Sequence, residues 1–278
     1  MAPPEPAPDS RPQRALISEI ASRQGLVAIA CLAALSALAW WWLWRTGAPG
    51  AGQLEMQDMP GMGMPAAVVA WTPAYIGGAF VMWAIMMTAM MLPSAGPMIL
   101  LHDVLARRDR LGGLATAAFA ASYLALWTAF AALAALAQAA LVGAGVLQPA
   151  GLAFGDGRLA ALLLLAAGLY ELSPLKRACL SQCQSPILFL TRHWRPGVGG
   201  AVGMGLRHGA ACIGCCIVLM LLLFAGGVMN LAWIALLAAV VLAEKYSPSA
   251  WRVDRILAGL LLAAAAVVFL SPSVMARI

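Results

Sequence analysis

The sequence predicts an all-α fold, a polytopic transmembrane helical bundle of about seven spans with a cytoplasmic N-terminus. The first reason is composition, because 63% of the 278 residues are hydrophobic and 10% are charged, which leaves too little polar surface for a soluble globule. The second is that the apolar runs are long and rich in Ala, Leu and Gly, without the alternation of an outer-membrane barrel. The third is an uneven distribution of basic residues between the loops.

Apolar runs separated by charged or Pro/Gly-rich breaks define the predicted spans. They cover residues 25–44, 75–101, 115–142, 158–173, 209–228, 231–244 and 256–271. The last two runs are the shortest. Residues 1–24 are predicted to be a disordered cytoplasmic tail, and residues 25–278 a single transmembrane helical domain with a methionine-rich outer loop at 45–73.

Basic residues indicate the orientation of this bundle. With the tail inside, 14 of the 17 Lys and Arg residues fall on the inner side, and only Arg45, Arg158 and Arg277 fall outside. That asymmetry is what the positive-inside rule requires, so we expect a multi-pass protein of the bacterial cytoplasmic membrane. The basic residues form no continuous face, which argues against a nucleic-acid partner despite a net charge of +6.

Small and aromatic residues predict how two of the spans pack. Trp40, Trp41, Trp42 and Trp44 end the first span, where indoles anchor a helix at the outer interface. In the third span, Ala117, Ala118, Ala121 and Ala125 predict a close approach to a neighbouring helix.

Sulfur is concentrated in two regions. Ten of the fifteen methionines lie between Met56 and Met98, and five of the six cysteines lie between Cys179 and Cys216. Thioethers and thiolates are soft ligands that favour Cu(I). The outer loop MQDMPGMGMP predicts a surface site that collects Cu(I) or Ag(I), with chance composition as the alternative. Its thioethers are Met56, Met59, Met62 and Met64.

The second span continues the methionines at helical spacing. Three- and four-residue steps place much thioether on one side of the helix, and the residues are Met82, Met86, Met87, Met90 and Met91. Gap filling in the core is the alternative for any one of them. Pro93 and Pro97 each free a backbone carbonyl, which a membrane helix tolerates only where protein or a cavity compensates. His102 and Asp103 follow, where the methionine column would meet harder ligands.

The cysteines form the sharpest pattern. Cys179 and Cys183 share a face if their segment is helical, and His208, Cys212 and Cys216 follow one another in four-residue steps. Met204 and Met220 extend this stripe, and Cys215 completes a CxxC motif with Cys212. In a reducing cytoplasm such thiols indicate a Cu(I) or Zn(II) site or a transient redox pair rather than a structural disulfide. Cys31, isolated in the first span, is interpreted as a small hydrophobe.

Few polar residues interrupt the remaining spans. Glu171 lies near the inner end of the fourth span and Asn230 at the turn before the sixth. Ionisable residues at membrane depth are candidates for function. Glu244 and Lys245 end the sixth span and are interpreted as solvated or paired at the interface.

The runs AMMLPSAGPM, LKRACLSQCQSP, GLRHGAACIGCC, GGVMNLAW and AEKYSP occur in this order over residues 80–250. Together they resemble a bacterial family of predicted metal-binding integral membrane proteins, some of them labelled copper chaperones. The positions that this resemblance marks are Met90, Met91, Pro93, Cys179, Cys183, His208, Cys215, Cys216, Met229, Asn230 and Glu244. The methionine loop is not part of that family pattern.

Three hypotheses follow. The first is a membrane protein that binds Cu(I), with zinc as the alternative ion, and transports it or hands it to a metallochaperone or a membrane metalloenzyme. Its ligands would be the outer-loop methionines, Met86, Met87, Met90, Met91, His208 and the cysteines at 179, 183, 212, 215 and 216. The second is a membrane thiol-disulfide oxidoreductase that uses the CxxC and the Cys179/Cys183 pair. The third is an accessory subunit that assembles a membrane metalloenzyme. No Walker motif and no catalytic constellation is present in the sequence, so we expect binding rather than enzymatic turnover.

Overall fold

The computed structural model describes residues 23–46, 70–107, 111–148, 151–247 and 253–270. Its helices are α2 (Arg23–Thr46), α5 (Pro73–Ala106), α6 (Gly112–Gly143), α7 (Gly157–Glu171), α8 (Pro174–Gln184), α9 (Pro186–His193), α10 (Gly197–Leu221), α11 (Leu223–Gly226), α12 (Leu231–Tyr246) and α13 (Val253–Leu270). One short antiparallel pair, β1 (Leu147–Gln148) with β2 (Ala153–Phe154), lies between α6 and α7. The fold is therefore all-α, as predicted.

Each of the seven predicted apolar runs coincides with a helix, but not every helix has the length of a membrane span. Within the described ranges, five helical segments are long and apolar enough: α2, α5, α6, α10 with α11, and α13. A sixth candidate is α7 with α8, which are bent by 66° at the break between them. The 16 residues of α12 fall short of a full crossing. The chain is a multi-pass membrane protein with five to six candidate spans, so the predicted number of about seven is not confirmed.

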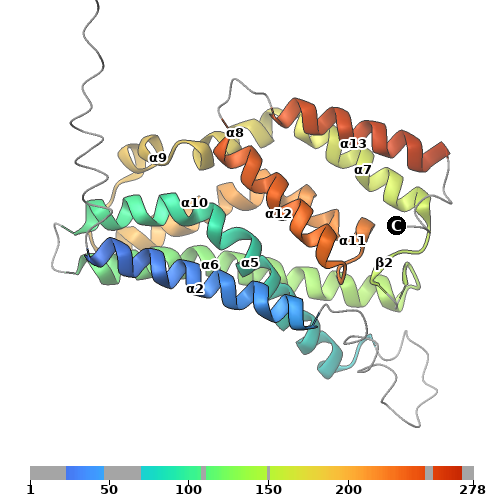
Figure 1. Ribbon diagram of the computed structural model, residues 1–278, viewed down its shortest axis with the longest axis horizontal. Coiled ribbons are helices and arrows are strands. Elements are labelled where there is room, and N and C mark those ends of the chain that lie inside the picture. Colours follow the sequence, from blue (N-terminus) through green and yellow to red (C-terminus); the bar gives the residue numbers. More distant parts are fainter. Residues whose placement is uncertain (1–22, 47–69, 108–110, 149–150, 248–252, 271–278) are drawn as a thin grey trace, which may run out of the picture.

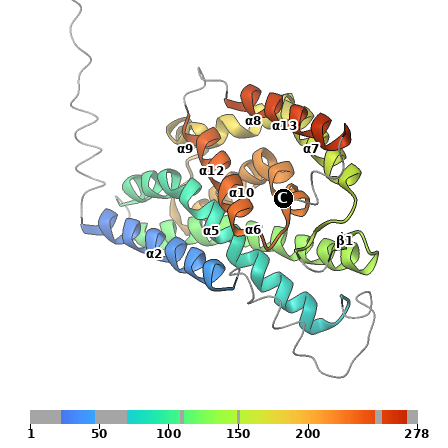
Figure 2. The same ribbon diagram turned by 45° about the vertical axis from the view of Figure 1, so that its right-hand side comes forward.

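Helix α10 occupies the centre of the bundle. It packs against α6 on one side and α8 on another, while α5 lies between α2 and α6 (Figure 1). Helices α7 and α13 pack against each other as a separate pair at the edge of the bundle. Helix α12 runs between that pair and α5 in both views (Figures 1 and 2). The central position of α10 explains why the cysteine stripe is buried rather than exposed to lipid.

The close contact between α6 and α10 depends on glycine in α10. A Cβ atom at Gly205 would lie 2.1 Å from Ser122 Oγ and 2.3 Å from the carbonyl oxygen of Phe119, so no larger residue fits there. The prediction from the alanines of α6 is wrong, because Ala117, Ala121 and Ala125 are exposed and lie outside the α10 contact. The sequence pattern identified a helix with small residues but not the face that packs.

Both prolines inside α5 have their missing hydrogen bonds replaced by other helices. Pro93 cannot bond the carbonyl of Ala89, and that oxygen accepts a hydrogen bond from Trp40 Nε1 at 3.1 Å. Pro97 likewise frees the carbonyl of Pro93, which accepts from the Tyr246 hydroxyl at 2.9 Å. Protein therefore compensates for both prolines, as the sequence required. Trp40 therefore packs against α5. The prediction that the tryptophans of α2 anchor the helix at the membrane interface fits only the exposed neighbours Trp41 and Trp44.

Candidate metal centre

The cysteines of α8 and α10 face one another in the interior. Cys183 Sγ lies 4.0 Å from Cys215 Sγ, and Cys215 Sγ lies 3.2 Å from Cys216 Sγ. Cys215 Sγ also donates to the carbonyl oxygen of Cys212 at 3.1 Å. The contact between Cys183 and Cys215 exists because α8 crosses α10, which places residues about thirty apart in the sequence in one cluster. We name Cys183, Cys212, Cys215 and Cys216 the thiol cluster.

Cys179 lies beside the thiol cluster but faces a different surface. A Cβ atom at Gly214 would be 2.7 Å from Cys179 Sγ, so this sulfur packs on the backbone of α10. The Tyr170 hydroxyl donates to the carbonyl of the same glycine. Cys179 and Cys183 therefore both reach α10, but of these two thiols in the described part of the chain it is Cys183 that contacts another sulfur atom.

Charged and hydroxyl groups surround Cys212. Lys245 Nζ from α12 lies 3.0 Å from Cys212 Sγ and donates to Ser94 Oγ at 2.8 Å. The Tyr123 hydroxyl from α6 lies 3.1 Å from the same sulfur and donates to the carbonyl of Met91 at 3.2 Å. The charge of Lys245 also interacts with Cys215 and Cys216. An ammonium in this position compensates the negative charge of a thiolate.

Of the two alternatives for Glu244 and Lys245, solvated or paired at the interface, burial contradicts the solvated one for both residues. Only 7% of the surface of Lys245 is exposed, because α12 turns it inward against α5 and α10. Glu244 is buried too and is paired, since Lys176 Nζ lies 2.8 Å from both of its carboxylate oxygens. Lys176 also contacts Glu171. Two carboxylates and two ammonium groups therefore lie in the protein interior, and of these Lys245 contacts a thiol.

His208 begins the buried stripe of α10. Its ring stacks on Phe119 and Tyr123 of α6 and meets Phe189 of α9 edge-on. Its Nδ1 is buried and has no hydrogen-bond partner among the described residues. Cys212 follows one turn later on the same face, so His208 offers an imidazole nitrogen on the line towards the thiol cluster.

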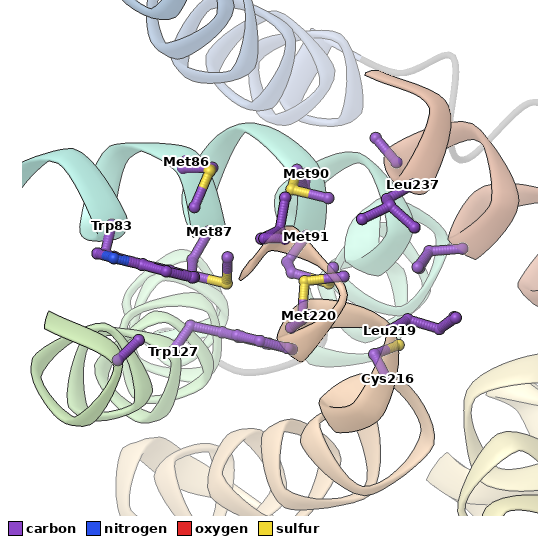
Figure 3. Packing of buried hydrophobic residues seen from close by; sticks show 14 of the residues in the cluster. Trp83, Met86, Met87, Met90, Met91, Trp127, Cys216, Leu219, Met220 and Leu237 are labelled. Carbon is purple, nitrogen blue, oxygen red and sulfur yellow. The ribbon is translucent and has the colours of Figure 1, made fainter. Parts of the chain in front are cut away.

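The methionines of α5 continue the buried sulfur beyond the thiol cluster. Met86, Met87, Met90 and Met91 are all buried. Figure 3 shows Met87 and Met91 on the side of α5 nearest Met220 of α10, while Met86 and Met90 point away from it. Met220 lies one turn beyond Cys216. The predicted column is thus divided between two sides of α5, and only Met87 and Met91 adjoin the α10 stripe.

The remaining predicted ligands fall into two groups. His102 Nδ1 lies 3.1 Å from Thr116 Oγ1, and Asp103 is paired with Arg107 at 2.6 Å, so both side chains already have partners. Met56, Met59, Met62 and Met64 lie outside the described residues.

The thiol cluster has the geometry of a two-ligand site. Within the described ranges, no group of three or more His, Cys, Asp and Glu side chains is arranged to hold a metal ion. At metal–sulfur bonds of about 2.3 Å, two sulfur ligands are about 3.8 Å apart in a tetrahedral site and up to about 4.6 Å apart in a linear one. The 4.0 Å between Cys183 and Cys215 falls in this range, whereas the 3.2 Å between Cys215 and Cys216 does not.

Sequence reasoning missed the residues around the sulfur atoms. Ser94 and Lys176 lie within the runs AMMLPSAGPM and LKRACLSQCQSP, and Tyr123 lies in the third apolar run, but no spacing connects any of them to the cysteines. Among these three residues only Lys176 offered a signal, because a charged residue at the end of an apolar run is a candidate for function at membrane depth.

Fold and site together define a multi-pass helical membrane protein whose interior contains a cluster of thiols, an ammonium group and adjoining thioethers. A family model described as PpoB2, copper chaperone, matches residues 80–268, which include every one of these groups. The chain belongs to this family, in agreement with the resemblance seen in its motifs. Neither the curated proteins nor the solved structures gave a match.

Proposed function

We propose that this protein binds Cu(I) as its cargo inside the membrane domain and passes it on, with Cys183 and Cys215 as the two thiolates of the tight site and Cys212 beside them. The observation that carries the proposal is the convergence of α8 and α10 thiols beside the Lys245 ammonium. The copper chaperone family supports the choice of metal. Soft thiolates favour Cu(I) over harder divalent ions.

Charge balance supports binding by two thiolates. A Cu(I) ion held by two thiolates carries one net negative charge, and Lys245 supplies the one positive charge that balances it. Leaving that charge unbalanced in a buried site would be strongly unfavourable. Lys176 is already paired with Glu244, so Lys245 is the ammonium that faces the sulfur atoms.

Thioethers provide the weaker binding positions. Met87, Met91 and Met220 adjoin the thiol cluster, and Met86 and Met90 lie on the far side of α5. Neutral thioethers bind Cu(I) without adding charge, and weak sites in series allow an ion to leave. In this proposal His208 and Cys179 are additional ligands close to the tight site, and the outer-loop methionines collect the ion.

The proposal places the chain in the bacterial inner membrane with the N-terminus and the thiol cluster on the cytoplasmic side. The distribution of basic residues supports this orientation. A bundle of about seven crossings would require α12 to complete a span with neighbouring residues. A metallochaperone or a membrane metalloenzyme would exchange copper with the protein.

The test uses the full chain in lipid nanodiscs, under reducing and anaerobic conditions. Cu(I) affinity is measured by competition with a chromophoric Cu(I) chelator for the wild type and for a Cys212/Cys215/Cys216→Ser variant. We expect stoichiometric Cu(I) in the wild type and its loss in the variant. Cys31→Ser is the matched control, because that thiol is exposed and far along the chain from the cluster. Preferential binding of Zn(II), or no metal at all, would refute the proposal.

Thiol-disulfide exchange is the second candidate. The observation in its favour is that Cys183 and Cys215, on different helices, have sulfur atoms 4.0 Å apart and are both free thiols. A small movement of α8 would bring them to the S–S distance of about 2.05 Å. Reversible formation of this disulfide, with no copper bound by the reduced protein, would favour exchange over copper binding.

A further inference from the structure

A basic pocket lies at the turn between α9 and α10. Its volume is about 230 Å³, and it is lined by Arg192, His193, Trp194, Arg195, Met204 and Arg207. The three arginines are exposed, whereas Met204 is buried beneath them. None of the lining residues in the described ranges is acidic. The pocket therefore presents three positive charges above a thioether.

This charge pattern selects the form in which copper can enter. Three guanidinium groups repel a free Cu(I) cation, and they attract anions, because guanidinium forms paired hydrogen bonds with carboxylates and phosphates. Cu(I) bound to two thiolates is an anion, and carboxylate groups on the thiol make it more negative. The pocket thus accepts copper as an anionic complex rather than as the bare ion.

The floor of the pocket leads to the tight site. Met204, His208 and Cys212 follow one another at four-residue steps on the buried face of α10. Eight residues of helix cover about 12 Å. The buried Nδ1 of His208, halfway along, has no hydrogen-bond partner in the described structure. A donor atom is therefore available at each turn between the pocket and the thiol cluster.

We propose that this pocket exchanges Cu(I) with a small anionic Cu(I)–thiolate complex. This inference rests on the proposed copper function. The carrier's carboxylates bind the arginines, the bond between Cu(I) and one carrier thiolate breaks, and a bond to the Met204 sulfur forms. The bond to the second carrier thiolate then breaks as a bond to His208 Nδ1 forms. Each carrier thiolate leaves with its electron pair, and copper remains Cu(I) throughout. The pocket is smaller than the 300–1,000 Å³ that enclose a drug-sized ligand, so it holds a carboxylate-bearing end of the carrier rather than the whole complex or a protein domain.

The experiment compares two donors that have the same copper–thiolate bond but opposite charge. Cu(I) is presented as its glutathione complex, which is anionic, or as its cysteamine complex, which is cationic. The full chain is held in phosphatidylcholine nanodiscs, and the copper retained after rapid desalting gives the transfer rate. We expect wild type to take copper at least about tenfold faster from glutathione, and added salt to reduce this preference.

Variants locate the preference. Arg192/Arg195/Arg207→Gln should lose about tenfold in rate from the anionic glutathione complex and should take copper from the cationic cysteamine complex faster than wild type, with unchanged equilibrium Cu(I) affinity as evidence of folding. The matched control, Arg158/Arg177/Arg255→Gln, removes three exposed charges outside the pocket and should behave as wild type. Met204→Leu should slow transfer from both donors.

The outcomes separate the two proposals. If wild type takes copper from neither donor, the copper function itself fails. If it takes copper from both donors at equal rates, or if the pocket variant keeps the preference, only the pocket inference is overturned. Nanodiscs that contain phosphatidylglycerol should leave the preference intact. If phosphatidylglycerol abolishes the preference for the glutathione complex, the pocket binds an anionic lipid headgroup, and the proposal of an anionic copper carrier is overturned.

Discussion

The thiol cluster and the methionine region are neighbouring parts of one buried core with opposite surroundings. Around Cys212 lie an ammonium, a phenol hydroxyl and a serine hydroxyl. Around Met87, Met91 and Met220 lie Trp83, Trp127 and aliphatic side chains (Figure 3). Sulfur is common to both, so the difference lies in the charge that each environment can stabilise.

That difference gives the two regions different chemical capacities. Polar groups beside the cysteines can stabilise a thiolate and hence hold an ion tightly. The apolar region can hold a cation only through neutral thioethers, because it offers no charge to balance a thiolate. We therefore expect substitutions in the thiol cluster to change Cu(I) affinity, and substitutions among the methionines to change the rate of transfer.

The largest effect should come from Cys183→Ser, compared with Cys179→Ser one turn away on α8. Cys183 approaches Cys215, whereas Cys179 packs on Gly214. Loss of Cys183, a ligand of the tight site, should lower Cu(I) affinity by more than about a hundredfold, whereas loss of Cys179, an additional ligand outside that site, should lower it less. Chelator competition in nanodiscs provides the measurement. Equal losses in the two variants would mean that the contact with Cys215 does not define the site.

Lys245→Met should have the next largest effect. Without the ammonium, a Cu(I) bis-thiolate is left with an unbalanced buried charge, so Cu(I) affinity should fall by about tenfold to a hundredfold. Lys245→Arg retains the charge and should recover part of the loss. The same competition assay measures both variants. Unchanged affinity in Lys245→Met would show that the lysine serves packing rather than charge balance.

Met91→Leu should alter kinetics without altering the tight site. The replacement preserves side-chain volume, so stability should change by less than about 1.5 kcal/mol. Copper transfer from the loaded protein to a soluble chelator should slow about tenfold because one thioether step is lost. Met98→Leu is the control, since Met98 is buried on the same helix and lies beyond Pro97. Equal rates of copper transfer in Met91→Leu and wild type would show that the methionines serve only to pack the core.

Trp40→Phe tests the scaffold and should have the smallest effect. It removes the hydrogen bond to the carbonyl that Pro93 leaves free, at a cost of about 1 kcal/mol. Thermal unfolding should shift by a few degrees, and Cu(I) affinity should not change. Trp41→Phe makes the same replacement at an indole that is 54% exposed and should leave stability nearly unchanged. A lower Cu(I) affinity in Trp40→Phe would connect the proline-containing region of α5 to the site.

The stripe on α10 illustrates what spacing can predict. His208, Cys212 and Cys216 were expected on one helical face, and all three are buried on it. Spacing also gave Cys179 and Cys183 one helix, but it did not distinguish the thiol that meets Cys215 from the thiol that meets a glycine backbone. The distinction depends on how α8 crosses α10, which no local pattern encodes.

By itself the sequence determined the membrane-type helices, the buried sulfur-rich stripe and the need to compensate two prolines, because hydrophobicity, helical period and the missing proline N–H are local properties. Only the tertiary structure decided that Trp40 and Tyr246 supply that compensation and that Lys245 and Tyr123 surround Cys212. These contacts join residues that are 33 to 153 positions apart. Their geometry follows from helix packing, which depends on the whole bundle at once.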